Sequence, residues 1–208
     1  MNNKDLGVII LAAGYSSRMK LFKPLLPLGN STIIESSIDS FLDAGIGNIT
    51  VVIGFQSEKL KPVLEDKGIK WIYNNKYSEG MYSSVVAGVS SLPDHIKAFF
   101  LLPADIPLVN SKTIHKIVEV YKQKKGGIIY PSFANRRGHP PLIDSSLFPE
   151  IISYNGSGGL KALLNKYEEK AYYIEVEDEG TVLDIDSYED YLELCNKHKL
   201  ILEKNSTL

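Results

Sequence analysis

A short polar loop with cationic side chains directly follows the first apolar segment of the chain. Residues 8–13 are apolar, and Gly14 and two serines come next. Arg18 and Lys23 follow, and no acidic residue occurs anywhere in positions 6–34. Small residues let a backbone approach a ligand closely, and amides and cations bind phosphate oxygens. The loop therefore predicts a phosphate-binding site, with ordinary solvated cations at a strand end as the alternative.

The same loop contains neither of two common nucleotide-binding motifs. It lacks the Gly-Lys-Ser/Thr ending of a P-loop, and G-x-G-x-x-G is absent from it. A redox dinucleotide-binding domain is disfavoured for that reason.

Two acidic segments could hold a divalent cation beside this loop. Asp105 ends an otherwise apolar run, and Pro107 stiffens the turn after it. In an extended segment, Asp184 and Asp186 would share one face. Mg²⁺ binds a few carboxylates and takes its other ligands from phosphates and water. Capping of a turn by Asp105, or of the next helix by Asp186, is the alternative.

Two further segments carry polar groups that suit a small ligand. Gly80, Ser83 and Ser84 lie where a helix is expected to begin, so they favour either base recognition or plain helix capping. His139 is flanked by Gly and Pro in a basic loop, where Arg137 and its neighbour could attract an anion or remain solvated.

The elements that must position these residues alternate between strands and helices. Nearly continuous apolar runs are typical of strands in a parallel sheet that is covered on both faces. The expected strands are 8–13, 49–54, 69–73, 98–102, 127–130, 171–176 and 182–185. Helical spacing is found at 34–42, 60–64, 85–92, 114–121 (with Ser111 as N-cap), 147–152, 160–164 and from 188 onward. This order predicts an α/β fold, a three-layer α/β/α sandwich with a mostly parallel Rossmann-like sheet.

Composition excludes several other classes of protein. The 208 residues contain one cysteine, so an internal disulfide or a cysteine metal cluster is impossible. A net charge of -2 argues against a broad nucleic-acid or membrane footprint. Without a targeting or membrane-spanning segment, we expect one cytoplasmic domain spanning 1–208, with a nucleotide half at about 1–110 and an acceptor half at about 111–198.

The chain resembles the MobA-like nucleotidyltransferases over roughly residues 7–195. The opening L-A-A-G-Y-S-S-R-M, followed by K-P-L-L-P-L-G, is similar to the signature of that family, and within it to the molybdenum cofactor cytidylyltransferase branch. Further likeness lies in the G-M-Y-S-S, D-I-P, G-H-P and D-I-D-S-Y-E-D segments. The resemblance implies the sheet of nucleotide-diphospho-sugar transferases.

The resemblance also implies a role for each site residue. The backbone of Leu11, Ala12, Ala13 and Gly14 would wrap the nucleotide, together with Gly80, Ser83 and Ser84. Arg18, Lys23 and Asp105 would be catalytic, with both cations on the phosphates. Asp105 and Asp186 would bind Mg²⁺, although Ser187-Tyr188 stands where the family has Thr-Pro. His139 and Ser157 would contact the acceptor, although Ser157 replaces the usual acid.

The implied reaction transfers CMP from CTP to a phosphate of the molybdopterin cofactor and releases pyrophosphate. In related enzymes an alanine at position 13 accompanies cytidine, whereas the guanylyl branch has glycine there. A molybdenum hydroxylase would receive the product. Two alternatives stay open: a sugar phosphate or other phosphorylated acceptor, and a non-catalytic protein that binds nucleotide and cofactor and passes the cofactor on.

Lys23→Ala is expected to abolish most turnover while the protein still folds, because the charge of the loop serves the phosphates. Pyrophosphate release and circular dichroism measure the two effects. A wild-type rate in this variant would contradict the phosphate assignment.

Overall fold

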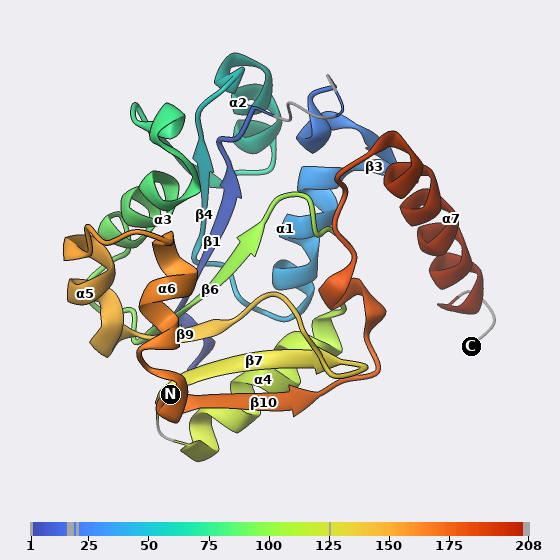
Figure 1. Ribbon diagram of the computed structural model, residues 1–208. Coiled ribbons are helices and arrows are strands. Elements are labelled where there is room, and N and C mark those ends of the chain that lie inside the picture. The colour runs from blue at the N-terminus through green and yellow to red at the C-terminus, as the bar shows by residue number, and fades with distance from the viewer. Residues whose placement is uncertain (1, 16–18, 20, 125, 206–208) are drawn as a thin grey trace.

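A mixed sheet with helices on both faces forms the centre of the molecule (Figure 1). The computed structural model describes residues 2–15, 19, 21–124 and 126–205. The strands are β1 (Leu6–Ala12), β2 (Pro27–Leu28), β3 (Ser31–Thr32), β4 (Ile49–Ile53), β5 (Lys70–Tyr73), β6 (Ala98–Pro103), β7 (Ile128–Phe133), β8 (Arg136–Arg137), β9 (Leu142–Asp144) and β10 (Ala171–Glu175). The helices are α1 (Ile33–Asp43), α2 (Ser57–Asp66), α3 (Met81–Ser90), α4 (Ser111–Lys124), α5 (Phe148–Ser153), α6 (Gly159–Asn165) and α7 (Tyr188–Asn205).

The strands run in the order β10-β7-β9-β6-β1-β4-β5, and most neighbours are parallel. Strand β9 is antiparallel to both β6 and β7. Two reversals restore the original direction, so β7 and β10 point the same way as β1 and β6. The carboxyl ends of strands from both halves of the chain therefore reach one edge of the sheet.

Alternate residues of β1 belong to two separate hydrophobic cores. Val8, Ile10 and Ala12 face α1, α2 and α4, whereas Ile9 and Leu11 face α3, α5 and α6. Because side chains alternate along a strand, a run that is apolar on both faces demands a helix layer on each side. The predicted three-layer α/β/α sandwich is confirmed.

The order of the strands also locates a crevice. From β1 the chain moves outward to β4 and β5, and it then returns to the other side of β1 as β6. In open α/β sheets, ligands bind beyond the carboxyl ends of strands at such a reversal. Leu11 and Pro103 are paired at this end of β1 and β6, and Asp105 follows directly.

Two expectations about local structure are wrong. Residues 182–185 do not form a strand: a 3₁₀ turn ends at Val182, and the extended segment beyond it does not join the sheet. Helix α4 is capped by Asn110 rather than Ser111, since the Asn110 side chain accepts from the amide of Lys112 at 2.9 Å. The short strands β8 and β9 were not expected from the sequence, because two or three residues are too few for periodicity to reveal.

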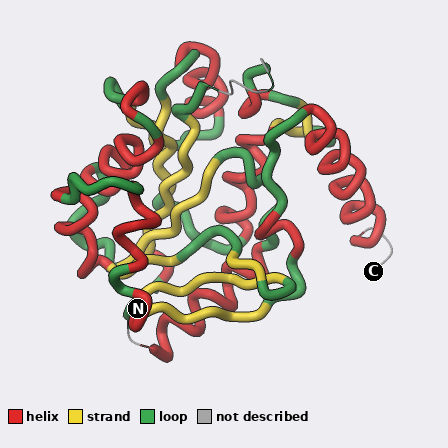
Figure 2. The backbone as a smooth tube through the Cα atoms, viewed as in Figure 1, coloured by secondary structure: helices red, strands yellow, loops and turns green. Residues whose placement is uncertain are grey.

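The C-terminal helix α7 lies to one side of the sheet and packs on the β2–β3 hairpin (Figure 2). The Tyr191 hydroxyl donates to the Pro27 carbonyl at 2.7 Å, and a third hydrophobic cluster joins Leu28, Ile185 and Leu194. No helix in the described part of the chain is both long and apolar enough to cross a membrane.

Gly88→Ala is expected to destabilise the protein by about 1–3 kcal/mol. Alanine normally stabilises a helix interior by about 0.5–1 kcal/mol relative to glycine. In α3, however, a Cβ at position 88 would lie 2.6 Å from Ile9 Cγ2 and 3.2 Å from Val52. Urea unfolding measures the change, with Ser90→Ala at the exposed end of the same helix as the control. A more stable Gly88→Ala protein would contradict the close packing of α3 on the sheet.

Candidate active site

The Lys23 ammonium joins three segments that are far apart in the sequence. Its Nζ donates to the Ile185 carbonyl and lies 3.5 Å from Asp105 Oδ2 and 3.8 Å from Asp186 Oδ1. The Lys23 side chain is 11% exposed, whereas those of Asp105 and Asp186 are 33% and 51% exposed. A nearly buried ammonium requires oxygen partners, and these three supply them. The structure thus brings Lys23, Asp105 and Asp186 together, as the site hypothesis requires.

Asp105 occupies the end of β6 beside β1. The amide of Ala104 donates to the Leu11 carbonyl at 3.0 Å, and the amide of Ile185 donates to the Asp105 carbonyl at 3.1 Å. Burial raises the pKa of the Asp105 carboxyl, and the Lys23 ammonium opposes that rise. The Asp105 carboxylate faces Lys23, whose Nζ lies 3.5 Å from Oδ2.

Helix α7 has its own cap, which frees Asp186 from the capping role. The Ser187 hydroxyl accepts from the Asp190 amide at 3.1 Å, and the Asp190 carboxylate accepts from the Ser187 amide at 2.6 Å. This reciprocal pair is a capping box. The Asp190 carboxylate also accepts from the Asp186 amide at 3.0 Å, and this bond fixes the backbone that carries the Asp186 carboxylate.

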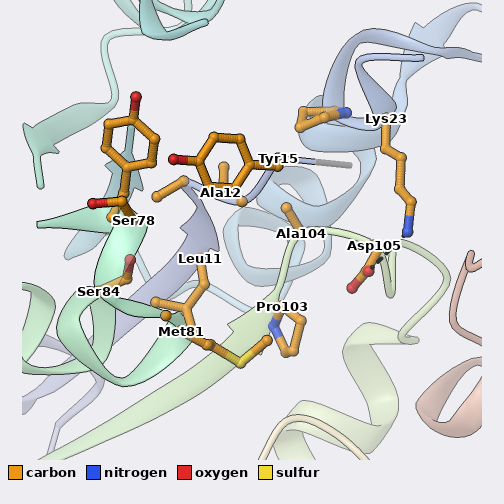
Figure 3. A pocket seen from close by; sticks show the side chains of 15 residues that line it. Leu11, Ala12, Tyr15, Lys23, Ser78, Met81, Ser84, Pro103, Ala104 and Asp105 are labelled. Atoms are coloured by element: carbon orange, nitrogen blue, oxygen red, sulfur yellow. Dashed lines mark hydrogen bonds and ion pairs between the residues drawn. The ribbon is translucent and has the colours of Figure 1, made fainter. Parts of the chain in front are cut away.

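A cavity of about 310 Å³ opens beside these charges at the sheet edge (Figure 3). Segments from β1, the loop after β5, the start of α3 and the end of β6 all contribute to it. Its lining is Leu11, Ala12, Ala13, Gly14, Tyr15, Lys23, Pro24, Tyr77, Ser78, Gly80, Met81, Ser84, Pro103, Ala104 and Asp105. Most of the predicted nucleotide-binding residues therefore line one cavity. Arg18 lies outside the residues that the structure describes.

Asn74 organises the side of this cavity at the start of α3. Its buried amide donates to Ser83 Oγ at 2.8 Å and to Ser84 Oγ at 2.9 Å. The Ser83 hydroxyl lies within hydrogen-bond distance of the carbonyls of Lys76 and Gly80 and can donate its one hydrogen to either. Ser83 is therefore engaged within the protein and does not line the cavity, whereas Ser84 and Gly80 do. Sequence analysis missed Asn74, although an amide directly after a strand was a visible signal.

Aromatic residues form another wall of the cavity that the sequence did not predict. The Tyr15 ring centroid lies 5.3 Å from that of Tyr77 and 5.2 Å from that of Phe55. Tyr77 packs so closely on β4 that a Cβ at Gly54 would lie 2.8 Å from its ring. Tyr15, which is 48% exposed, is thus held at the cavity by a fixed neighbour.

A second cavity of about 360 Å³ shares a wall with the first. Leu11, Met81 and Pro103 line both cavities. Tyr82, Tyr130, Arg137, His139, Lys161 and several aliphatic side chains complete the second one. The Arg137 guanidinium lies 4.8 Å from the Tyr130 ring centroid, which places a cation at a largely apolar cavity. His139 thus lines a cavity next to the first, as an acceptor residue should.

Ser157 and Asp186 lie outside the lining of both cavities. Ser157 is exposed, and its neighbours Gly158 and Gly159 line the second cavity instead. Gly158 is the N-cap of α6, so Ser157 is not the cap of that helix either. Asp186 is connected to the first cavity by its ion pair with Lys23, which lines that cavity.

The donor set near Lys23 fits a divalent cation. The carboxylates of Asp105 and Asp186 converge on one positively charged point, and carboxylate oxygens are the ligands that Mg²⁺ and Mn²⁺ prefer. Among the described residues, no cluster of three or more acidic, histidine or cysteine side chains could hold a metal. A metal here would therefore need further ligands from a phosphate group and water.

Comparison with known proteins identifies the class of protein to which this fold and site belong. The family model described as the MobA-like NTP transferase domain matches residues 8–171. The chain therefore belongs to the MobA-like NTP transferase family, as its motifs predicted, and nucleotidyl transfer is the class of reaction that this membership supports.

Two relatives that align with most of this chain have names that describe different activities. It is 29% identical to the molybdenum cofactor cytidylyltransferase of Escherichia coli K12, over 88% of this chain and 92% of that protein. It is 27% identical to the nicotine blue oxidoreductase of Paenarthrobacter nicotinovorans, over 89% and 94% respectively.

Among solved structures, the fold is similar to that of Rv0371c of Mycobacterium tuberculosis. The TM-score is 0.81 at 22% identity, over 94% of this chain and all of the other. A manganese complex of that protein matches with a TM-score of 0.75 at 20% identity, over 93% of this chain and 98% of the other.

His139→Gln is expected to reduce the loss of stability in acid. Burial lowers the pKa of the His139 imidazole below its usual value, with Arg137 adding to the effect and Asp184 opposing it. The unfolded chain then binds a proton more readily, so stability is lost as pH falls through about 6.5 towards the pKa of the folded state. Between pH 7.5 and 5.5 the variant should lose up to about 1 kcal/mol less than wild type.

Urea unfolding at the two pH values measures this difference. His198, whose pKa burial also lowers, is present in both proteins and so cancels in the comparison. His115→Gln, at an exposed histidine of α4, controls for the substitution itself. Equal losses in wild type and His139→Gln would contradict the prediction.

Proposed function

We propose that this protein transfers a CMP group from CTP to a phosphate of the molybdopterin cofactor and releases pyrophosphate. The observation that carries the proposal is the cluster of Lys23, Asp105 and Asp186 beside a cavity that shares a wall with a second one. Two reactants in adjoining cavities, with charges beside one of them, suit a transfer between two bound molecules.

In this proposal the first cavity binds the nucleoside triphosphate. The small residues Ala12, Ala13 and Gly14 leave the backbone accessible, while Ser84 and the Gly80 turn offer polar contacts. Lys23 lines the same cavity and could reach a phosphate. Arg18, which follows in the same loop of the sequence, would add a second cation. Ala13 supports the choice of CTP, through the resemblance to cytidylyl enzymes.

The acceptor would occupy the second cavity. Its aromatic and aliphatic walls suit the flat ring system of a pterin, and Arg137 and Lys161 suit its phosphate. His139 would contact the acceptor from the floor of this cavity. Ser157 would have to act from outside the observed lining, so its proposed role is the one with least geometric support.

The reaction requires little acid–base chemistry from the protein. An oxygen of the acceptor phosphate attacks the α-phosphorus of CTP and forms a new P–O bond. The bond from that phosphorus to the bridging oxygen breaks, and pyrophosphate leaves with the electron pair. Because the attacking phosphate is already ionised, the protein acts by positioning both reactants and by neutralising charge with Lys23 and Arg18.

Asp105 and Asp186 would hold the Mg²⁺ ion, which when bound supplies charge neutralisation at the phosphates. The manganese complex of the structurally similar Rv0371c supports the use of a divalent cation in this fold. The cytoplasmic location, the receiving molybdenum hydroxylase and the two halves of the domain stay predictions from the sequence.

The assay that tests this function measures pyrophosphate with each of the four NTPs, Mg²⁺ and a panel of acceptors. We expect release only with CTP and the molybdenum-loaded pterin. Release with sugar phosphates alone would favour the alternative acceptor class. Tight nucleotide binding without turnover would favour a non-catalytic carrier. Conversion of nicotine blue, the compound in the name of one relative, would instead indicate an oxidoreductase.

Asp105→Asn serves as the site control in the same assay. It should lower the rate about 10²–10³-fold, because it removes a charge at the point of phosphate chemistry. Asp94→Asn, at an exposed loop residue, should keep the wild-type rate.

A further inference from the structure

The position of Lys23 has a consequence for how metal and nucleotide bind, and it rests on the proposed function. Lys23 Nζ lies between the two carboxylates, 3.5 Å from Asp105 and 3.8 Å from Asp186, and it also donates to the Ile185 carbonyl. The oxygens that suit a divalent cation therefore already face an ammonium group. We propose that Lys23 is a placeholder cation, which occupies the metal position until a triphosphate draws it away.

Electrostatics supports a competition between the two cations. Two positive charges repel when they share the same pair of carboxylates, most strongly where the lysine side chain is only 11% exposed. Without the charge of the lysine, a metal that approaches Asp105 and Asp186 would meet less repulsion. The ammonium therefore stabilises the empty site at the expense of binding a metal alone.

The ammonium group of Lys23 has a second possible position, in the first cavity. Lys23 lines the first cavity as well as contacting the carboxylates, so its ammonium stands between the nucleotide position and the metal position. A lysine carries its charge on a flexible four-carbon stem, whereas the backbone here is held in a 3₁₀ turn, Lys23–Leu25. A phosphate in the cavity can therefore attract the ammonium by side-chain rotation alone.

The result is positive coupling between nucleotide and metal. Each phosphate contact that Lys23 gains weakens its competition with a divalent cation for the two carboxylates, and linkage makes the effect reciprocal. The site would thus bind a divalent cation weakly by itself and strongly in the presence of triphosphate. Lys23 has two roles in this scheme: it contacts the phosphates, and it withholds the carboxylates from a metal that arrives alone.

Calorimetric titration of Mn²⁺ into the nucleotide-free protein tests whether Lys23 acts as a placeholder cation. Lys23→Met, which removes the charge and keeps the length of the side chain, should bind Mn²⁺ about tenfold more tightly than wild type, within the usual range of site coupling. Lys23→Arg retains the charge and should stay weak. Lys67→Met removes a lysine paired with Asp39 away from the site and should match wild type.

Two further proteins show whether any gain comes from the carboxylates and not from altered folding. Adding Asp186→Asn to Lys23→Met should reverse the gain in Mn²⁺ affinity. Lys23→Gln, which keeps a neutral donor, should show the same gain as Lys23→Met and replaces that variant if it does not fold. Thermal unfolding of each protein confirms that the titrated sample is native.

The outcomes separate this inference from the proposed function. Tight Mn²⁺ binding by wild type without nucleotide would overturn the placeholder, as would equal affinities in wild type, Lys23→Met and Lys23→Gln. If wild type still binds Mn²⁺ with CTP and releases pyrophosphate in those cases, nucleotidyl transfer stands. Failure of wild type to bind Mn²⁺ even with CTP would overturn both.

Discussion

The active-site edge of this protein is organised by one nearly buried ammonium. Moving an ammonium out of water is costly unless oxygen atoms replace the water, and Lys23 finds them on residues 82 and 162 positions away in the sequence. The interaction thereby ties the loop after β1 to the end of β6 and to the segment before α7. Removing either carboxylate would take one of its oxygen partners from an ammonium in a poorly solvated place. The contacts of Lys23 therefore determine both how the three segments are arranged and how charge is distributed at the site.

The sheet makes that contact possible. The reversal of strand order at β1 leaves a crevice between the carboxyl ends of β1 and β6, where the small residues of the loop and Asp105 meet. Strand β9 lies antiparallel between β6 and β7, so β7 points the same way as β6, and His139 lines a cavity together with Leu11 and Pro103 at the same edge. The first cavity is lined by residues between 11 and 105, and the second adds residues between 130 and 164 while sharing Leu11, Met81 and Pro103 with the first. The architecture therefore places two cavities side by side at one edge of the sheet.

The sequence predicted the parts that depend on local pattern. Long apolar runs identified the main strands, and helical spacing identified the helices, because burial on both faces leaves a continuous signal. Lys23, Asp105 and the residues after β1 were also found, since charge and small side chains at strand ends are visible in one dimension. The features that the sequence did not predict depend on contacts with residues far away in the chain. Nothing local shows that Asn74 holds two serines, and β9 has only three residues.

Local pattern also gives no decision where two neighbouring residues could take the same role. Asp186 and Ser187 are adjacent, and either could cap α7. The reciprocal bonds with Asp190 decide for Ser187 and leave the carboxylate of Asp186 to face Lys23. In the same way Asn110 precedes Ser111 and takes the cap of α4. Such choices depend on backbone direction, which residue type alone does not determine.

Helix α7 contributes no residue to the lining of either described cavity, yet it borders the segment that holds the site together. Its Tyr191 bonds Pro27, just after the turn that carries Lys23, and a Cβ at Gly29 would lie 2.7 Å from His198 on the same helix. Leu194 meets Ile185, whose carbonyl accepts from Lys23. Sequence change along this outer helix can therefore retune the active site while every ligand-contacting residue stays the same, which offers evolution a way to adjust activity without altering what is recognised.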